Sequence, residues 1–516
     1  MRSRAVVLAS FLALGISSVA SAQTLGAVLT GSQEVPPTTS PGFGNFTGTF
    51  DAARANMTVT LTVTNLGAAI SGFHIHEKVA GTQSGGVIVN FPGQGGTFVN
   101  NKMTGTFAVP ADVAARMLAN PSNFYVNVHT TQFGGGAIRG DLAIASDGVV
   151  TYAADLRGSN EFPVNSSAAF GSAFVTIDTI NNTLAWEVNT SGIASPSASH
   201  IHGPNGAAGT NAGVLIAFAS NAAAFTAGRT KGSVSIASLS AENRAALLTS
   251  PSNFYVNVHS TAFGGGEIRG QLVPANEYDV PVAGRVVNGA GTTFVTDLRI
   301  FNPSYDSAVN ALIEYFQVGT SANTNATQSL AVNIPPRGTA SLDDVTGATG
   351  LNVSGSTGAL RVSAASKLAV TSRIYADFRA SGKGTIGQFA AGAPRSNALR
   401  RGVLPQLSNQ SDLTSGSRTN IGFFNPTTQT VTVRLELRDA SGAATSTGLV
   451  TLQPLSQQQN SLGTYFPGTD LSNAQKLTLS FDANAPIVAY ASVVDNVSTD
   501  QIFVYAQEDS GVATAP

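Results

Sequence analysis

The sequence contains no cysteine among its 516 residues. This absence excludes disulfide bonds, thiolate metal ligands, a cysteine nucleophile and a lipid-modified N-terminal cysteine. Charged residues are also scarce, at 11% of the chain, and the formal net charge is only −2. Binding to nucleic acid or to an anionic membrane is therefore not expected. Stability must come from the packing of apolar side chains.

Long apolar runs are missing except at the start of the chain. Arg2 and Arg4 precede an apolar stretch that ends in "ASA", Ala20 to Ala22, the pattern of a cleavable secretory signal peptide. We expect cleavage after Ala22 and a mature protein beginning at Gln23. No later run approaches the roughly 20 apolar residues that span a bilayer. The sequence therefore predicts a secreted or periplasmic protein with no transmembrane segment.

The first half of the chain is duplicated. "LANPSNFYVNVHTTQFGGGAIRGDL" returns as "LTSPSNFYVNVHSTAFGGGEIRGQL", and "LTGSQEVPP" returns as "LRGSNEFPV". A weaker duplication in the second half relates "TTFVTDLRIFNPSYDSAVNALIEYF" to "GSRTNIGFFNPTTQTVTVRLELRD". Repeats of this size indicate successive structural units. We predict a signal peptide and four domains, at residues 1–22, 23–146, 147–277, 278–398 and 399–516.

Each unit shows the period-two alternation of half-buried strands, for example in "MTVTLTVTNL" and "FYVNVH". One segment of each N-terminal repeat, "PADVAARMLANP" or "SAENRAALLTSP", is typical of a short helix closed by proline. The fold class predicted is all-β, with tandem β-sandwiches and a helical crossover in each of the first two.

All six histidines of the chain lie in the two N-terminal repeats, as two copies of His-x-His and one distant histidine. Residues two apart on a strand share one face at a separation of about 6.6 Å. Imidazole nitrogens are common ligands of zinc and copper. The candidate metal ligands are His74, His76, His129, His200, His202 and His259. Two alternatives stay open, namely a structural hydrogen-bonded cluster and a binding surface without metal.

Other polar residues recur at equivalent places and are candidates to support these histidines. Glu34 and Glu161 offer a carboxylate, while Arg139 and Arg269 could hold an anion or pair with those carboxylates. The residues that alternate onto the face of the distant histidine are Tyr125, Tyr255, Asn127 and Asn257. The triple glycines at 134–136 and 264–266 predict tight turns, because no helix or lysine follows them.

The motifs "LTGSQEVPP", "GFHIHE", "SNFYVNVHT" and "GGGAIRGDL", with their second copies, resemble CHRD domains, which are named from the extracellular protein chordin. The resemblance covers about half of the chain. It implies immunoglobulin-like sandwiches that act as extracellular binding modules. "GFHIHE" also resembles the copper-ligand strand of Cu/Zn superoxide dismutases, but the bridging histidine, the zinc histidines and the cysteine pair of that family are missing.

Two classes of function follow from these observations. One is a non-enzymatic, secreted binding protein with one three-histidine copper or zinc site per repeat and an extracellular protein or glycan as its ligand. The other is a copper enzyme similar to superoxide dismutase. A structural or adhesive protein without metal is a third reading. The motifs of common hydrolases and nucleotide-binding proteins are missing, and we assign no catalytic residue.

Overall fold

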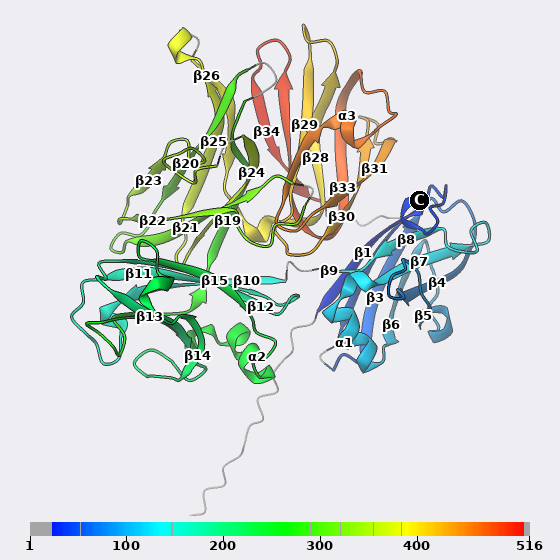
Figure 1. Ribbon diagram of the computed structural model, residues 1–516. Helices are drawn as coiled ribbons and strands as arrows, with labels where there is room; N and C mark the ends of the chain where they lie inside the picture. Colours follow the sequence, from blue (N-terminus) through cyan, green and yellow to red (C-terminus); the bar gives the residue numbers. More distant parts are fainter. Residues whose placement is uncertain are drawn as a thin grey trace, which may run out of the picture.

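The computed structural model describes residues 23–51, 53–145, 148–287, 291–319, 321–353, 355–382 and 384–509. These residues form an all-β protein, as the alternating patterns predict, with short helices between strands (Figure 1). The predicted signal peptide, residues 1–22, lies outside the described residues. Within the described part of the chain, no helix has the length and apolarity needed to cross a membrane.

The first repeat is one antiparallel sheet with the strand order β5-β4-β7-β8-β1-β2-β3-β6, and β9 pairs with β1. Alternate residues of the strands point to one side, where Phe46, Leu61, Ile75 and Val126 are fully buried in a common core. The strands are β1 (Thr24–Thr30), β2 (Phe43–Phe50), β3 (Asn56–Thr64), β4 (Ile70–Glu77), β5 (Val87–Asn90), β6 (Lys102–Ala108), β7 (Phe124–Thr130), β8 (Ile138–Asp141) and β9 (Ala143–Ile144).

The second repeat has the same topology, in the order β14-β13-β16-β17-β10-β11-β12-β15, and β18 pairs with β10. Duplicated sequence has therefore produced duplicated strand order. The strands are β10 (Val149–Arg157), β11 (Phe170–Asp178), β12 (Thr183–Ser191), β13 (Pro196–His202), β14 (Val214–Ala219), β15 (Arg229–Ser235), β16 (Tyr255–Ser260), β17 (Ile268–Gln271) and β18 (Val273–Pro274).

One α-helix per repeat leads from the end of the sheet back toward its middle, at the two predicted places. These helices are α1 (Ala111–Ala119), before β7, and α2 (Ala241–Thr249), before β16. Val113 and Met117, four residues apart on one face of α1, are buried in the core. The short 3-10 helices of the chain are η1 (Gly31–Gln33), η2 (Pro92–Gln94), η3 (Pro121–Asn123), η4 (Gly158–Asn160), η5 (Ala222–Ala224), η6 (Pro251–Asn253), η7 (Arg379–Ser381) and η8 (Arg395–Asn397).

In each of the two C-terminal units, one long strand passes from one hydrogen-bonded layer to another. β19 (Asn276–Val287) pairs first with β24 and then with β20, and β33 (Asn473–Asp495) pairs first with β28 and β30 and then with β29 and β34.

The other elements of the third unit are β20 (Thr293–Phe301), β21 (Val309–Gln317), β22 (Gln328–Ile334), β23 (Thr339–Leu342), β24 (Ser356–Ala364), β25 (Ala369–Asp377), β26 (Thr385–Ala391) and β27 (Ala393–Pro394). Those of the fourth unit are β28 (Leu399–Gln410), β29 (Ser417–Phe424), β30 (Val431–Arg438), β31 (Ala444–Leu452), β32 (Gln457–Ser461), α3 (Leu462–Tyr465), β34 (Gln501–Tyr505) and β35 (Gln507–Glu508). Both units are therefore built almost entirely from strands.

Each N-terminal repeat packs against one C-terminal unit (Figure 1). The backbone N–H of Ile144, in the first repeat, donates to Gln429 Oε1 at 2.8 Å, and Gln429 Nε2 donates to the Ile144 carbonyl at 2.6 Å. In the second repeat Phe174 packs against Leu312 of the third unit. The first unit therefore contacts the fourth, although they are the most distant in sequence.

Candidate metal centre

The histidines of the first repeat lie on two neighbouring antiparallel strands. His74 and His76 belong to β4, and His129 belongs to β7. The strand register places His76 opposite Tyr125 and His74 opposite Asn127. Because side chains alternate along a strand, these residues share the face turned away from the core. The residues between them, such as Phe73, Ile75 and Val126, point into the core.

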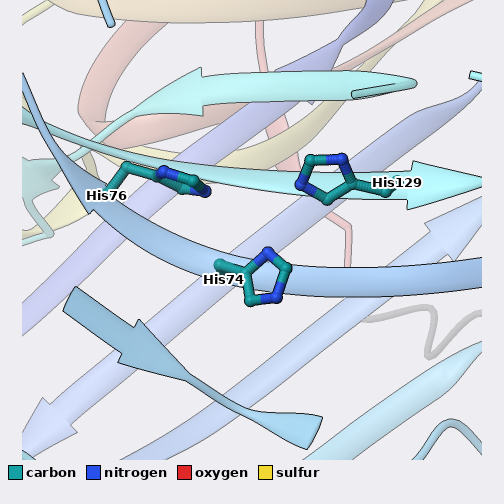
Figure 2. Close-up of side chains that lie close together, drawn as sticks. All are labelled: His74, His76 and His129. Atoms are coloured by element: carbon teal, nitrogen blue, oxygen red, sulfur yellow. The ribbon is translucent and has the colours of Figure 1, made fainter. Parts of the chain in front are cut away.

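The three imidazoles converge on one another (Figure 2). The ring centroid of His74 lies 5.6 Å from that of His76 and 5.1 Å from that of His129, and the corresponding distances in the second repeat are 5.5 and 5.0 Å. In each triad, one ring nitrogen per histidine lies within 4.8 Å of the others. The structure therefore brings together each predicted set of three histidines.

Backbone carbonyls determine which nitrogen of two rings carries the proton. His76 Nδ1 lies 3.0 Å from the carbonyl oxygen of Gly85, and His129 Nδ1 lies 3.0 Å from that of Gly134. A carbonyl oxygen only accepts hydrogen bonds, so a neutral imidazole must place its proton on Nδ1. The Nε2 lone pairs of both rings therefore remain free to bind a cation.

The nitrogens that face the centre of the first triad have no hydrogen-bond partner among the described residues. They are His74 Nδ1, His76 Nε2 and His129 Nε2, and all three atoms are buried. Buried polar atoms are usually paired, because an unpaired one forfeits its hydration. Three such imidazole nitrogens at one place are atoms of the type that ligate Zn²⁺ and Cu²⁺.

The second triad has the same rings but closer polar neighbours. His202 Nδ1 lies 2.9 Å from the Ala212 carbonyl oxygen and His259 Nδ1 lies 3.0 Å from that of Gly264, so both rings place their proton on Nδ1. His259 Nε2 therefore accepts from His200 Nδ1, at 3.2 Å. Both Nε2 atoms lie 3.1 Å from Oδ1 of Asn257. Unlike the first triad, the second therefore has polar atoms within hydrogen-bond distance of its inward-facing nitrogens.

Burial favours the neutral form of the first histidine in each triad, His74 and His200. It lowers the pKa of His74 to about 4, with the neighbouring imidazoles of His129 and His76 acting in the same direction. Burial and the two neighbouring imidazoles also lower the pKa of His200 to about 4. The neutral form, which is the form that ligates a metal, therefore predominates in these two rings at neutral pH.

A phenol and a guanidinium are stacked on one histidine of each triad. The ring of Tyr125 lies parallel to that of His76 at 4.8 Å, and the guanidinium carbon of Arg139 lies 3.5 Å from the Tyr125 centroid. In the second repeat the corresponding distances are 4.7 Å for His202 on Tyr255 and 3.4 Å for Arg269.

The predicted carboxylates lie near the glycine turns. Glu34 and Glu161 are each only 6% exposed, and burial raises the pKa of both carboxyls to about 7. A Cβ atom at Gly136 would lie 2.3 Å from Glu34 Oε1, so glycine makes room for the carboxyl group. Glu34 Oε1 has no hydrogen-bond partner in the described part of the chain.

The arginines were predicted to hold an anion or to pair with Glu34 and Glu161, and the structure shows other partners for both. Arg139 forms an ion pair with Asp141 at 3.6 Å, and Arg269 donates to Gln271 Oε1 at 3.1 Å. Within the described part of the chain, neither arginine forms an ion pair with Glu34 or Glu161. The guanidinium groups instead lie on the tyrosine rings, and they donate to backbone carbonyls of the loops at residues 78–86 and 203–213.

Sequence reasoning missed the backbone groups that orient the rings, namely the carbonyls of Gly85, Gly134, Ala212 and Gly264. The triple-glycine motifs signalled a turn beside the third histidine but gave no sign of a hydrogen bond to it. The loop containing Gly85 carries no pattern that relates it to His76.

A family model described as the CHRD domain matches residues 25–142 and 152–272. No curated protein matches the sequence. One similar solved structure is "Crystal Structure of Thermotoga maritima 1070", at 14% identity and a TM-score of 0.19, with 22% of this chain and 99% of that chain covered. At this TM-score the similarity supports no inference about the fold or the function of the chain. Because the family model matches both triad-bearing repeats, each of these two repeats is a CHRD domain.

Proposed function

We propose that this chain is an exported, non-enzymatic binding protein that holds one copper or zinc ion in each CHRD domain. The ligands are His74, His76 and His129 in the first domain, and the second set is His200, His202 and His259. An ion bound by three neutral imidazoles keeps a coordination position for a further ligand, such as a group of an extracellular protein or glycan.

The observation that carries the proposal is the set of three buried, unpartnered nitrogens in the first triad. A structural hydrogen-bonded cluster would pair its buried atoms with one another or with nearby groups. In the second triad His200 Nδ1 does lie 3.2 Å from His259 Nε2. In the first triad the hydrogen bonds to Gly85 and Gly134 direct two lone pairs toward the centre, and none of the three inward-facing nitrogens has a hydrogen-bond partner among the described residues. This arrangement favours a cation over a purely structural role.

Copper-dependent dismutation of superoxide is the alternative that the His-x-His strand suggests. It is favoured less, because the second metal ligands and cysteine pair of those enzymes are missing from the sequence. Copper-loaded protein, freed of unbound copper, that consumes superoxide no faster than the metal-free protein supports binding alone.

The test is a count of bound metal. The mature chain, stripped with a chelator, is dialysed against Zn²⁺ or Cu²⁺, and metal per chain is measured by mass spectrometry. We expect about two ions per chain, about one in His74→Ala or His200→Ala, and none in the double variant. Each triad is expected to act alone, because each lies in its own domain.

Glu77→Gln is the matched control. Glu77 ends the same strand as His74 and His76, but its carboxylate is paired with Arg116 at 2.9 Å. This variant should still bind two ions. Unchanged stoichiometry in the double histidine variant, or no uptake by the wild-type chain, would overturn the proposal.

A further inference from the structure

Each tyrosine of the candidate centres is buried between a cation and a ligand ring. Tyr125 is 5% exposed and Tyr255 is 3% exposed, and each phenol lies flat against an imidazole on one side and a guanidinium on the other. Cation–π attraction and ring stacking favour these flat contacts. Because both domains have the same column of three groups, its geometry is not an accident of one loop.

All three members of the column form hydrogen bonds with the loop that follows the His-x-His strand, which we name the cover loop. In the first domain this cover loop is residues 78–86. Arg139 donates to the Gln83 carbonyl, the Tyr125 hydroxyl accepts from the Gly85 N–H at 3.3 Å, and His76 Nδ1 donates to the Gly85 carbonyl at 3.0 Å.

The second domain holds its cover loop, residues 203–213, in the same way through different backbone groups. Arg269 donates to the Ala207 carbonyl at 3.2 Å and the Tyr255 hydroxyl accepts from the Ala212 N–H at 3.4 Å. His202 Nδ1 donates to the Ala212 carbonyl at 2.9 Å. The two loops differ in sequence, yet arginine, tyrosine and histidine clamp both of them.

We infer that Tyr125 and Tyr255 are positioning residues, which fix the orientation of His76 and His202 and thereby couple each metal centre to its cover loop. The inference rests on the proposed metal binding. An ion on His76 Nε2 restrains the ring whose Nδ1 holds Gly85, so metal binding and closure of the loop stabilise each other. Such coupling is reciprocal, so weakening the loop clamp weakens metal binding.

The experiment uses the His200→Ala chain, in which only the first centre remains. Into it we introduce Tyr125→Leu, which removes the ring, and Tyr125→Phe, which keeps the ring but removes the hydroxyl. We expect Tyr125→Leu to weaken Zn²⁺ binding by about 10–100-fold, the usual effect of losing an outer-shell partner. Tyr125→Phe should recover most of this loss.

Two further readouts separate positioning from general damage. Zn²⁺ should slow amide hydrogen exchange in residues 79–86 of the parent chain but not of the Tyr125→Leu chain, and the Cu²⁺ electron paramagnetic resonance spectrum should change in Tyr125→Leu. Tyr375→Leu is the matched control, since Arg373 also lies over that ring, at 4.7 Å, in the third unit, whose sequence contains no histidine. When His200 is retained, the second centre of Tyr125→Leu should bind normally.

Equal affinity, spectrum and loop protection in the parent and Tyr125→Leu chains would overturn the inference while leaving the metal proposal standing. Absence of Zn²⁺ uptake by the parent chain would overturn both. Loss of binding in both domains of Tyr125→Leu would indicate global damage and would count against a local positioning role.

Discussion

Replacing Glu161 by glutamine should change how the stability of the second domain depends on pH. Burial raises the pKa of this carboxyl from 4.5 to about 7, although Arg269 and a backbone N–H act in the opposite direction. The folded domain therefore binds the proton more tightly than the unfolded chain does. Stability from this group is fully present below pH 4.5 and is lost as the pH rises toward 7.

The size of the effect follows from the shift. One pKa unit corresponds to about 1.4 kcal/mol, so the shift to about 7 sets a ceiling of about 3 kcal/mol for the loss between pH 4.5 and 8. Hydration of the carboxylate as the domain relaxes reduces this figure, and we expect about 1–2 kcal/mol. Glutamine does not titrate, so Glu161→Gln should lack this loss.

Trp186 is the only tryptophan of the chain and packs against the core of the second domain, so its fluorescence reports that domain. Urea unfolding of metal-free protein is followed at pH 4.5 and pH 8 for the wild type and Glu161→Gln. The matched control is Glu34→Gln, which lies in the other domain and should leave the Trp186 transition unchanged. An identical pH dependence in the wild type and Glu161→Gln would refute this reasoning.

Three other outcomes are expected. Gly136→Ala should destabilise the first domain by about 1–3 kcal/mol in urea unfolding, because Gly136 has a φ of 134° and faces the Glu34 carboxyl. The control is Gly134→Ala, which should be nearly neutral because no atom lies within 4 Å of the new Cβ. Zn²⁺ at a hundredfold excess over the Kd should raise the free energy of unfolding of each CHRD domain by about 2.7 kcal/mol in the wild type. The thermal midpoint should therefore rise in the wild type but not in His74→Ala/His200→Ala, and equal shifts would argue against binding at the triads. In metal-free protein, NMR titration should show the His74 and His200 rings neutral down to about pH 4, and midpoints near the ordinary value of 6.5 would contradict the burial of these rings.

The sequence was informative where the signal is local or duplicated. Period-two alternation predicted β3 and β7, and the repeated motifs predicted that six histidines form two sets of three. Alternation also placed Tyr125 and Asn127 on the face of His129. It did not show that Tyr125 lies opposite His76, because that depends on the register between β4 and β7, which no single strand encodes.

Longer-range features were not predictable in the same way. The Gly85 and Gly134 carbonyls orient the rings through loop conformations, and a backbone carbonyl has no side-chain signature. β33 passes between two layers near Pro486, which lacks an N–H and leaves the ladder there unpaired. The contact of Gln429 with the first domain depends on two surfaces that are complementary only once both units are folded.

The most direct test of the central claim is X-ray absorption spectroscopy of the zinc-loaded chain. The account predicts three imidazole nitrogens at about 2.0–2.1 Å around each ion, and in His74→Ala half as much bound zinc with the same shell around each remaining ion. A first shell made of oxygen atoms, or an unchanged imidazole signal in the variant lacking both His74 and His200, would contradict it.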